Sequence, residues 1–427
     1  MGSVSVSRST IHGSIKAPPS KAYTHRTVIA AGLSPGNSVI KNPLVSEDTQ
    51  TTLNAVKSFG AIVAAKRKTW AIQGREKVKS PQNIIDCRES GATLRFLAPI
   101  MACASGITIL TGRGRLLHRP QEPLLKALRQ LGVKCYSAPG DGNPPLILFG
   151  GGLRGGKVKM RGNVSSQYVS GLLFAAPYAA RDIEINVIGD LESKPYVDIT
   201  IDVLKKHSIK VQFEKEPPTF QVHHHQKYKP SDHQIEGDYS SAAFLLAAAA
   251  VTGSKIRIEN LPKDSLQGDK EIIQILKEMS LKVNHLENEV QIRGNIGQST
   301  MVDATHIPDL VPVIAVLGCF ADGKTVIRNV ERLRYKESDR ITSIIAEIRK
   351  MGIDIQASNH DLIIDPKRSP RPARFESHQD HRIAMACCVA ALGIKKPSKV
   401  IHPEVIAKSY PSFIDDLKKL GAEIKNG

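Results

Sequence analysis

The chain has 427 residues, of which 41% are hydrophobic and 23% are charged. This length and composition predict one to three globular domains and exclude a wholly disordered chain. The net charge of +18 suits an anionic partner, which can be a nucleic acid, a membrane surface or small acidic molecules. The first ten residues lack the apolar core of a secretory signal, and no segment has the roughly 18 apolar residues of a membrane span. We therefore expect a cytoplasmic protein without a membrane partner.

One pattern of segments repeats six times along the chain. An apolar, Ala-rich segment ends at a turn and is followed by a short β-rich run, a polar loop and a second, amphipathic segment. The six copies span residues 21–63, 90–135, 165–211, 238–283, 306–355 and 379–424.

Local signals within each copy agree on the type of each element. The first segment is too apolar for a surface helix, so we expect a helix that is buried nearly all round. Short β-branched runs such as residues 107–110 and 255–258 predict strands, and Leu124, Leu128 and Leu131 show the spacing of an amphipathic helix. Each copy is therefore a βαβ-type unit with two helices, and the fold class is α/β. The polar stretch 227–234 separates copies one to three from copies four to six and is the expected domain boundary.

Polar residues recur at two equivalent positions of the copies: the start of the buried helix and the loop that enters the second helix. Free N–H groups at helix starts attract anions, so a ring of such starts forms a concentrated anion site. Guanidinium groups suit both phosphate and carboxylate ligands. We therefore predict ligands that carry several negative charges, bound by seven cations: Lys21, Arg26, Arg119, Lys336, Arg340, Arg382 and Lys408.

The same residues lie in ten motifs that follow one another along essentially the whole chain. They are PPSKAYTHR (18–26), SGATLR (90–95), HRP (118–120), VSSQ (164–167), SKPYVDIT (193–200), EGD (236–238), HIPD (306–309), RYKESDR (334–340), DHRIAM (380–385) and AKSYP (407–411). In this order they resemble the motifs of the 3-phosphoshikimate 1-carboxyvinyltransferase (EPSP synthase) family.

The resemblance implies a fold and a reaction. The fold is a two-domain inside-out α/β barrel with three units in each domain, one domain at 20–232 and the other at 1–19 and 233–427, and with the active site in the cleft between them. The first domain in the sequence is an insertion, and an N-terminal strand around residues 4–15 returns to the second domain. The reaction transfers the enolpyruvyl group of phosphoenolpyruvate to the 5-hydroxyl of shikimate 3-phosphate and releases phosphate, a step toward chorismate and aromatic amino acids. It implies no cofactor, no metal, no nucleic acid and a monomer.

The resemblance also implies roles for individual residues. Asp309 is the base for the hydroxyl, and Glu337 and Lys21 are candidates for proton delivery to carbon; the sequence does not decide between these two. The residues implied for shikimate 3-phosphate are Lys21, Arg26, Ser165, Ser166, Gln167, Ser193, Tyr196, Asp309 and Lys336. Those implied for phosphoenolpyruvate are Lys21, Gly91, Arg119, Gln167, Arg340, Arg382 and Lys408.

Three positions depart from the family pattern. Ala22 stands where a serine that contacts the shikimate ligand is usual, Ala92 stands where a threonine is usual, and Arg332 stands where some members have an asparagine. A missing hydroxyl that water replaces costs about 0.5–1.5 kcal/mol, so we expect weaker binding and not loss of function.

Two other functions remain alternatives. A UDP-N-acetylglucosamine enolpyruvyl transferase shares the fold and the donor, but its characteristic loop carries a reactive cysteine, and residues 112–120 contain none. A nucleic-acid-binding protein would explain the charge of +18, but only 5% of the residues are aromatic and no basic stripe interleaves with them. The six cysteines contain no C-x-x-C pair, and Cys387 and Cys388 are expected to be buried free thiols.

Overall fold

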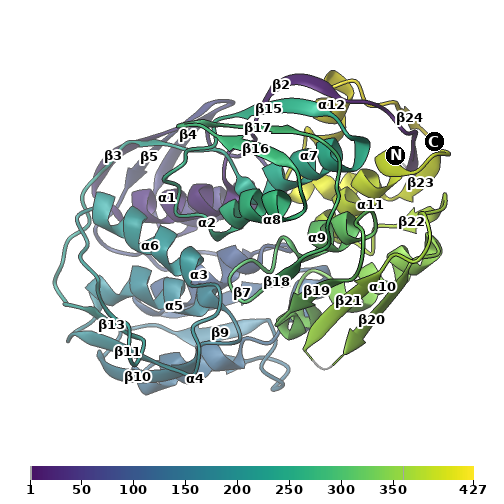
Figure 1. Ribbon diagram of the computed structural model, residues 1–427. Coiled ribbons are helices and arrows are strands. Elements are labelled where there is room, and N and C mark those ends of the chain that lie inside the picture. Colours follow the sequence, from purple (N-terminus) through teal and green to yellow (C-terminus); the bar gives the residue numbers. More distant parts are fainter. Residues whose placement is uncertain (1, 359) are drawn as a thin grey trace. The chain divides into compact units, whose positions relative to one another are not determined.

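The computed structural model describes residues 2–358 and 360–427, and the chain divides into two compact units (Figure 1). The inserted unit contains Pro19–Ile235. The terminal unit contains the chain up to Pro18 together with Glu236–Gly427.

In the inserted unit, three copies follow the order helix, strand, helix and two-stranded hairpin. The first consists of α1 (Lys21–Leu33), β3 (Gly36–Lys41), α2 (Glu47–Ser58), β4 (Ile62–Lys66) and β5 (Thr69–Gly74). The second, with the strand β6 (Ile85–Asp86) before it, consists of α3 (Gly91–Ala102), β7 (Ile107–Thr111), η1 (Gly114–His118), α4 (Glu122–Gln130), β8 (Lys134–Ser137) and β9 (Leu146–Phe149). The third, with its flanking strands, consists of β10 (Gly156–Arg161), α5 (Ser166–Ala175), η2 (Ala176–Tyr178), β11 (Ile183–Ile188), α6 (Lys194–Lys206), β12 (Gln212–Glu214), β13 (Thr219–Val222) and β14 (His233–Gln234).

The terminal unit repeats the same order three more times. Its first copy has β2 (His12–Lys16), α7 (Tyr239–Thr252), β15 (Lys255–Glu259), η3 (Gly268–Glu271), α8 (Ile272–Glu278), β16 (Lys282–His285) and β17 (Glu289–Arg293). Its second has β18 (Met301–Asp303), α9 (Val311–Gly318), β19 (Thr325–Arg328), η4 (Glu331–Tyr335), α10 (Arg340–Lys350), β20 (Asp354–Ser358) and β21 (Asp361–Asp365). Its third has β1 (Ser3–Val6), β22 (Arg374–Glu376), α11 (His381–Gly393), β23 (Ser398–Ile401), η5 (Pro403–Lys408), α12 (Phe413–Lys419) and β24 (Ile424–Asn426).

The strands form six four-stranded sheets, which confirms the predicted α/β class with six repeated units. The strand orders are β14-β3-β5-β4, β6-β7-β9-β8 and β10-β11-β13-β12 in the inserted unit, and β2-β15-β17-β16, β18-β19-β21-β20 and β22-β23-β1-β24 in the terminal unit. In each sheet the first two strands are parallel and the remaining neighbours are antiparallel.

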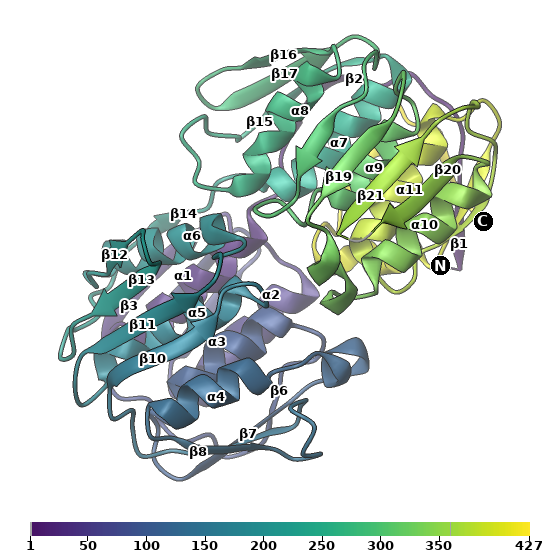
Figure 2. The same cartoon turned by 60° about the horizontal axis from the view of Figure 1, so that its bottom comes forward.

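Within each unit the apolar helices lie inside and the sheets lie outside (Figure 2). Every residue of α7 except the last two is buried, and α1 and α11 are buried almost as completely. The outer strands instead alternate between buried and exposed residues, as β5 and β11 do. Helices that are apolar all round need such enclosure, so the predicted inside-out arrangement follows from their composition.

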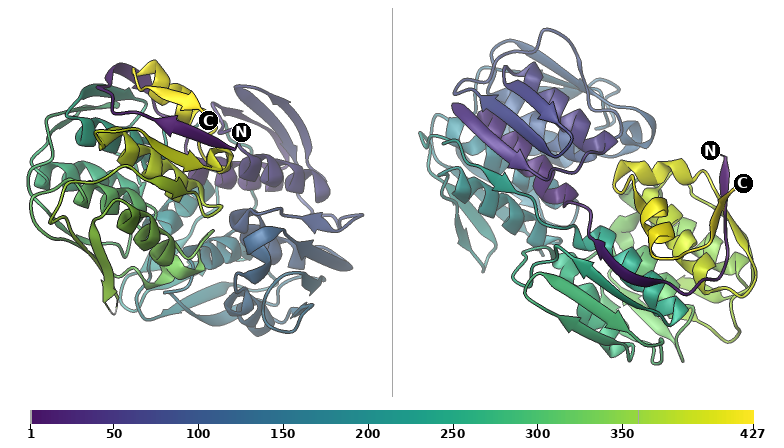
Figure 3. Two further views of the ribbon diagram at one scale, coloured as in Figure 1. Left: turned by 90° about the vertical axis from the view of Figure 1, so that its right-hand side faces the viewer. Right: turned by 90° about the horizontal axis from the view of Figure 1, so that it is seen from above.

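Three sheets are completed by strands from distant parts of the chain. Residues 233–234 form β14, which pairs in parallel with β3 of the first copy. The N-terminal segment forms two strands and not the single strand expected around residues 4–15. β1 lies between β23 and β24, close to the C-terminus, whereas β2 pairs with β15 of another sheet (Figure 3). The break between β1 and β2 lets this segment cross from one sheet to the next.

All six cysteines are free; five are buried and Cys103 is partly buried. The prediction of buried free thiols at Cys387 and Cys388 is therefore confirmed. No helix among the described residues is both long enough and apolar enough to cross a membrane.

A pair of buried histidines joins α6 to β14 in the inserted unit. His207 is the C-cap of α6. Its Nδ1 lies 2.8 Å from the carbonyl oxygen of Lys229, so this nitrogen carries the proton. The Nε2 atoms of His207 and His233 are 2.9 Å apart, and the rings stack with centroids at 5.0 Å. His233 Nε2–H therefore donates to the bare Nε2 of His207. Burial lowers the pKa of His207 to about 4, and burial together with His207 and Lys206 lowers that of His233 to about 3.

This pair predicts loss of stability in acid. Because both pKa values are lower in the folded chain than in the unfolded one, the stabilisation is complete above about pH 6.5 and is lost as the pH falls toward 4 and 3. The expected loss in the free energy of unfolding between pH 7.5 and 4.5 is on the order of 5 kcal/mol for the two histidines together. His233→Gln keeps a donor without titrating, so urea unfolding at the two pH values should show a smaller difference than in wild type. The exposed His12→Gln is the control, and an unchanged difference in His233→Gln would contradict the prediction.

Candidate active site

The predicted site residues form two sets, one in each unit. Most of these residues lie at or just before helix starts, as the repeat pattern predicts, whereas Arg26 is the sixth residue of α1 and Lys408 ends η5. The set in the inserted unit is Lys21, Arg26, Gly91, Arg119, Ser165, Ser166, Gln167, Ser193 and Tyr196. The set in the terminal unit is Asp309, Lys336, Glu337, Arg340, Arg382 and Lys408.

Serine caps create the helix starts of the inserted unit. The side chains of Ser20, Ser90 and Ser165 accept hydrogen bonds from N–H groups in the first turns of α1, α3 and α5. Such caps satisfy one free N–H each and leave the others available to a ligand. The first turns of these three helices contain no acidic residue that would compete with an anion.

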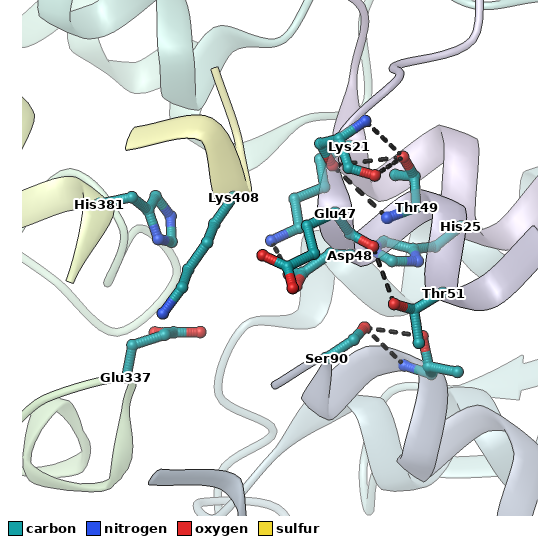
Figure 4. A network of polar contacts seen from close by, with 12 residues as sticks. Lys21, His25, Glu47, Asp48, Thr49, Thr51, Ser90, Glu337, His381 and Lys408 are labelled. Carbon is teal, nitrogen blue, oxygen red and sulfur yellow. Dashed lines mark hydrogen bonds and ion pairs between the residues drawn. The ribbon is translucent and has the colours of Figure 1, made fainter. Parts of the chain in front are cut away.

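Lys21 is the first residue of α1, and its Nζ forms an ion pair with the carboxylate of Asp48 in the first turn of α2 (Figure 4). The Lys21 side chain is 20% exposed, so the ammonium is held but remains accessible. This contact ties the start of α1 to the start of α2.

Arg26 is a buried cation that lacks a carboxylate partner among its hydrogen bonds. Its Nε donates to Thr200 Oγ1 at 2.7 Å and its Nη1 to the carbonyl oxygen of Ala22 at 3.0 Å. Its guanidinium lies over the ring of Phe96 at 5.1 Å and over that of Tyr196 at 5.9 Å. Nη2 is buried and has no hydrogen-bond partner in the described part of the chain. Burial lowers the pKa of Arg26 to about 10, as expected for a cation that an anionic ligand would stabilise.

Gly91 and Arg119 lie against each other at the start of α3. A Cβ atom at position 91 would be 3.0 Å from Arg119 Nη1, so only glycine leaves room for the guanidinium in this position. Arg119 follows η1 and is 6% exposed. The arrangement puts a cation beside the free N–H groups of a helix start, which favours an anion there.

Arg95, the other buried arginine of the second copy, links this copy to the third. Its Nη1 donates to Gln167 Oε1 at 2.9 Å and its Nε to Gln121 Oε1 at 3.1 Å, while Gln121 donates to the carbonyl oxygen of Arg119 at 2.8 Å. Gln167 and the Arg119 backbone are thereby held by one hydrogen-bonded network.

The three predicted phosphate-binding serines occupy the starts of α5 and α6. Ser165 caps α5 and accepts from the N–H of Gln167 at 3.3 Å, and Ser166 is the first residue of the helix. Ser193 precedes α6 with φ of +55°, a left-handed conformation that is uncommon for serine. Pro195 in the first turn of α6 has no N–H, and the left-handed Ser193 turns the chain sharply into the helix. Backbone strain of this kind is concentrated at binding sites.

Asp309 is the centre of an ion network in the terminal unit. Its Oδ1 lies 2.8 Å from Arg340 Nη1, and its Oδ2 lies 3.0 Å from Arg382 Nη2. Lys336 Nζ is 3.9 Å from Oδ1. The sequence places Asp309 at a helix start, but α9 begins only at Val311, so Asp309 lies in the turn before it and contacts Arg340 of α10 and Arg382 of α11.

Arg340 is held by three carboxylates. It is 2% exposed, and besides Asp309 it contacts Glu337 Oε2 and Asp380 Oδ2, each at 2.8 Å. Asp380 is fully buried and also caps α11 by accepting from the N–H of Arg382 at 2.9 Å. Burial lowers the pKa of Arg340, but Asp380, Glu337 and Asp309 outweigh burial and raise it.

The network also sets the charges of Asp309 and Lys336. Burial raises the pKa of Asp309, but Arg382, Lys336 and Arg340 outweigh it and hold the pKa well below its ordinary value. Burial lowers the pKa of Lys336 to about 8, against the opposing effect of Asp309. Asp309 is therefore ionised, while Lys336 titrates near pH 8.

Lys408 and Glu337 complete the set. Lys408 ends η5, and its Nζ donates to the carbonyl oxygen of Gln379 at 3.2 Å. Its ammonium points toward the Glu337 carboxylate (Figure 4).

Four charged residues contribute to these networks but were not predicted as site residues: Asp48, Arg95, Asp269 and Asp380. Burial raises the pKa of Asp269 to about 7, and Asp309 adds to this effect. Asp269 lies in the loop that enters the second helix of the fourth copy, so repeat equivalence could have identified it. A charge inside an apolar helix was the available signal for Arg95. Asp48 and Asp380 stand at helix starts that the sequence did mark, but which cations they face depends on the fold.

Comparison with known proteins gives a consistent result over the whole length. A family model described as EPSP synthase (3-phosphoshikimate 1-carboxyvinyltransferase) matches residues 6–417. The 3-phosphoshikimate 1-carboxyvinyltransferase of Methanocaldococcus jannaschii is 43% identical over 419 residues, covering 97% of each chain. That of Methanococcus maripaludis strain C5 is 42% identical over 419 residues, again covering 97% of each chain.

Solved structures show the same fold at lower identity. EPSP synthase from Acinetobacter baumannii superposes with a TM-score of 0.84 at 24% identity, covering 100% of each chain. The enolpyruvyl transferase NikO from Streptomyces tendae superposes with a TM-score of 0.79 at 19% identity, covering 100% of this chain and 99% of the other. At these identities the likeness concerns the fold alone.

Proposed function

Because the chain belongs to the EPSP synthase family, we propose that it transfers the enolpyruvyl group of phosphoenolpyruvate to the 5-hydroxyl of shikimate 3-phosphate, releasing phosphate. The observation that carries this function is the match along the whole chain to relatives that bear the enzyme's name at 42–43% identity. The two sets of cations at helix starts supply what two multiply anionic substrates need.

In this proposal the inserted unit binds most of shikimate 3-phosphate. Ser165, Ser166 and Ser193 hold the 3-phosphate at the starts of α5 and α6, where the helix dipoles favour negative charge. Arg26, with its unpaired Nη2, and Tyr196 face the same ligand. Lys336 and Asp309 of the terminal unit bind its hydroxyl groups.

Phosphoenolpyruvate is assigned to residues of both units. Gly91 and Arg119 offer a helix start and a guanidinium in the inserted unit, and Lys21 and Gln167 lie at the starts of α1 and α5. Arg340, Arg382 and Lys408 supply positive charge in the terminal unit. This charge stabilises the phosphate as it departs, which is the electrostatic part of catalysis.

The chemistry requires one base and one proton donor. Asp309 takes the proton of the 5-hydroxyl as its oxygen attacks C2, and Glu337 or Lys21 delivers a proton to the methylene carbon. The tetrahedral adduct then loses phosphate and a proton from the same carbon. While Asp309 is paired with Arg340 and Arg382 it is a weak base. An anionic substrate that engages these arginines would raise the pKa of Asp309 and activate it.

The substitution Ala22→Ser tests the first departure from the family pattern. Ala22 is partly buried in the first turn of α1, one residue from Lys21. A serine hydroxyl there adds one hydrogen bond to the shikimate ligand, worth about 0.5–1.5 kcal/mol, so KM for shikimate 3-phosphate should fall by about two- to tenfold. Steady-state kinetics with saturating phosphoenolpyruvate measures this change. An unchanged or higher KM would show that Ala22 does not face this ligand.

The decisive experiment for the reaction is a phosphate-release assay with phosphoenolpyruvate and two alternative acceptors. Release with shikimate 3-phosphate and not with UDP-N-acetylglucosamine is the expected result. Release with the second acceptor alone would favour the UDP-N-acetylglucosamine enolpyruvyl transferase, and the absence of release with both would reject the proposal.

The remaining parts of the proposal concern organisation and surroundings. The domain boundaries at 20–232 and at 1–19 with 233–427, and an active site in the cleft between the domains, stay predictions. So does a cytoplasmic monomer that binds neither nucleic acid nor a membrane. A smaller scattering radius on adding shikimate 3-phosphate would support closure of the domains. Light scattering measures the molar mass and so tests the monomer, and an RNA mobility shift at physiological salt tests the absence of nucleic-acid binding.

A further inference from the structure

Four buried residues of the inserted unit form a continuous chain of hydrogen bonds across three helices. His25 Nδ1 on α1 lies 2.7 Å from Thr52 Oγ1 on α2. Thr52 Oγ1 lies 2.6 Å from Thr93 Oγ1 on α3, which in turn lies 2.7 Å from Ser90 Oγ. All four residues are at most 2% exposed. Figure 4 includes His25 and Ser90, the two ends of this chain.

The chain has one direction that uses each hydroxyl proton once. Ser90 Oγ accepts from the N–H of Thr93 at 3.3 Å and donates its own proton to Thr93 Oγ1. Thr93 then donates to Thr52, and Thr52 donates to His25 Nδ1, since its alternative acceptor, the carbonyl oxygen of Asp48, is 3.4 Å away. In this direction His25 accepts at Nδ1, which makes it a neutral imidazole with its proton on Nε2.

The surroundings of His25 keep it in this form. Burial, and then the charges of Lys21 and Arg26, lower its pKa well below its ordinary value. An imidazolium would present a proton on Nδ1 to the hydroxyl that already donates to it, so protonation would reverse or break the chain. Its Nε2 is buried and has no hydrogen-bond partner among the described residues.

The two ends of the chain lie beside residues assigned to different substrates. His25 is flanked in α1 by Arg26 and lies one turn after Lys21. Ser90 directly precedes Gly91, whose Cα faces the Arg119 guanidinium. A displacement of the Ser90 cap would move the free N–H groups at the start of α3 relative to Arg119.

We propose that His25 is a positioning residue that, through Thr52 and Thr93, fixes the start of α3 for phosphoenolpyruvate. This inference rests on the proposed function, because that function assigns the start of α3 to the donor substrate. His25 itself touches no reacting atom; it supplies the final acceptor of a hydroxyl chain that holds Ser90 in one orientation.

The test compares variants that cut the chain with variants that preserve it. His25→Leu removes the acceptor, and Thr52→Val replaces the central hydroxyl with a methyl group of similar size. Each should raise KM for phosphoenolpyruvate by about three- to tenfold, the effect of about one hydrogen bond, and change KM for shikimate 3-phosphate less than twofold. His25→Asn keeps an acceptor at the position of Nδ1, and Thr52→Ser keeps the hydroxyl, so both should behave like wild type.

Thr51→Val is the matched control, because the Thr51 hydroxyl donates only within α2, to the carbonyl oxygen of Glu47 at 2.8 Å. If the residues act as one chain, the double variant His25→Leu/Thr52→Val should be no worse than either single variant. Equal rises in both KM values, a change in thermal stability alone, or additive effects in the double variant would each overturn the proposal. Failure of wild type to release phosphate from the two substrates would instead reject the proposed function.

Discussion

Lys21→Ala is expected to lower kcat/KM for phosphate release by about a thousandfold or more while the fold remains intact. Lys21 is assigned to both substrates, and the loss of a charge that stabilises the transition state costs about this much. Its ion pair with Asp48 is mostly buried, at 20% and 13% exposure, so removing the ammonium should also lower the stability. Steady-state kinetics together with thermal unfolding separates the two effects. Lys126→Ala, at an exposed position of α4, is the control. A kcat/KM within about threefold of wild type would remove Lys21 from the site.

A second variant separates two possible roles of Lys21. Arg keeps the positive charge but does not release a proton at neutral pH. If Lys21 delivers the proton to carbon, Lys21→Arg should lose kcat and keep much of its substrate binding. If Lys21 acts through charge alone, Lys21→Arg should recover most of the activity, and Glu337 becomes the proton donor.

Asp309→Asn should lower kcat by about a hundred- to ten-thousandfold, the usual contribution of a general base. Asn has nearly the size of Asp, but its amide group cannot accept from both Arg340 and Arg382, which now contact the two carboxylate oxygens at 2.8 and 3.0 Å. The exposed Asp264→Asn in the same unit is the control. A loss of less than about fivefold would identify another base, and Glu337→Gln would then be the variant to measure.

The pH dependence of Asp309→Asn gives an independent check. Lys336 has a pKa of about 8 because burial lowers it while Asp309 opposes burial. In wild type, KM for shikimate 3-phosphate should therefore rise above about pH 8, as Lys336 loses its proton. Without the Asp309 charge the pKa of Lys336 falls further, so the rise in KM should begin at a lower pH. The same onset in both proteins would show that Lys336 does not bind this substrate.

The class of fold and the kind of ligand could be inferred from local patterns in the sequence. Helices that are apolar all round, as residues 239–250 are, must be enclosed, and the short β-branched runs after them predict strands. The six copies placed cations at equivalent helix starts, which predicted multiply anionic ligands. These inferences were possible because apolar periodicity, helix caps and turns are local properties of the chain.

Other features were decided only by the tertiary structure. β14 pairs with β3, and β1 lies between β23 and β24. These pairings could not be predicted, because the strands come from distant segments that are too short to indicate a partner. The partners of the cations were also beyond the sequence: Asp380 holds Arg340 from another helix, and the hydroxyl chain from His25 ends at Ser90. A charge or a hydroxyl can be read from one position, but its hydrogen-bond partner and its pKa depend on burial and on neighbours that only folding brings together.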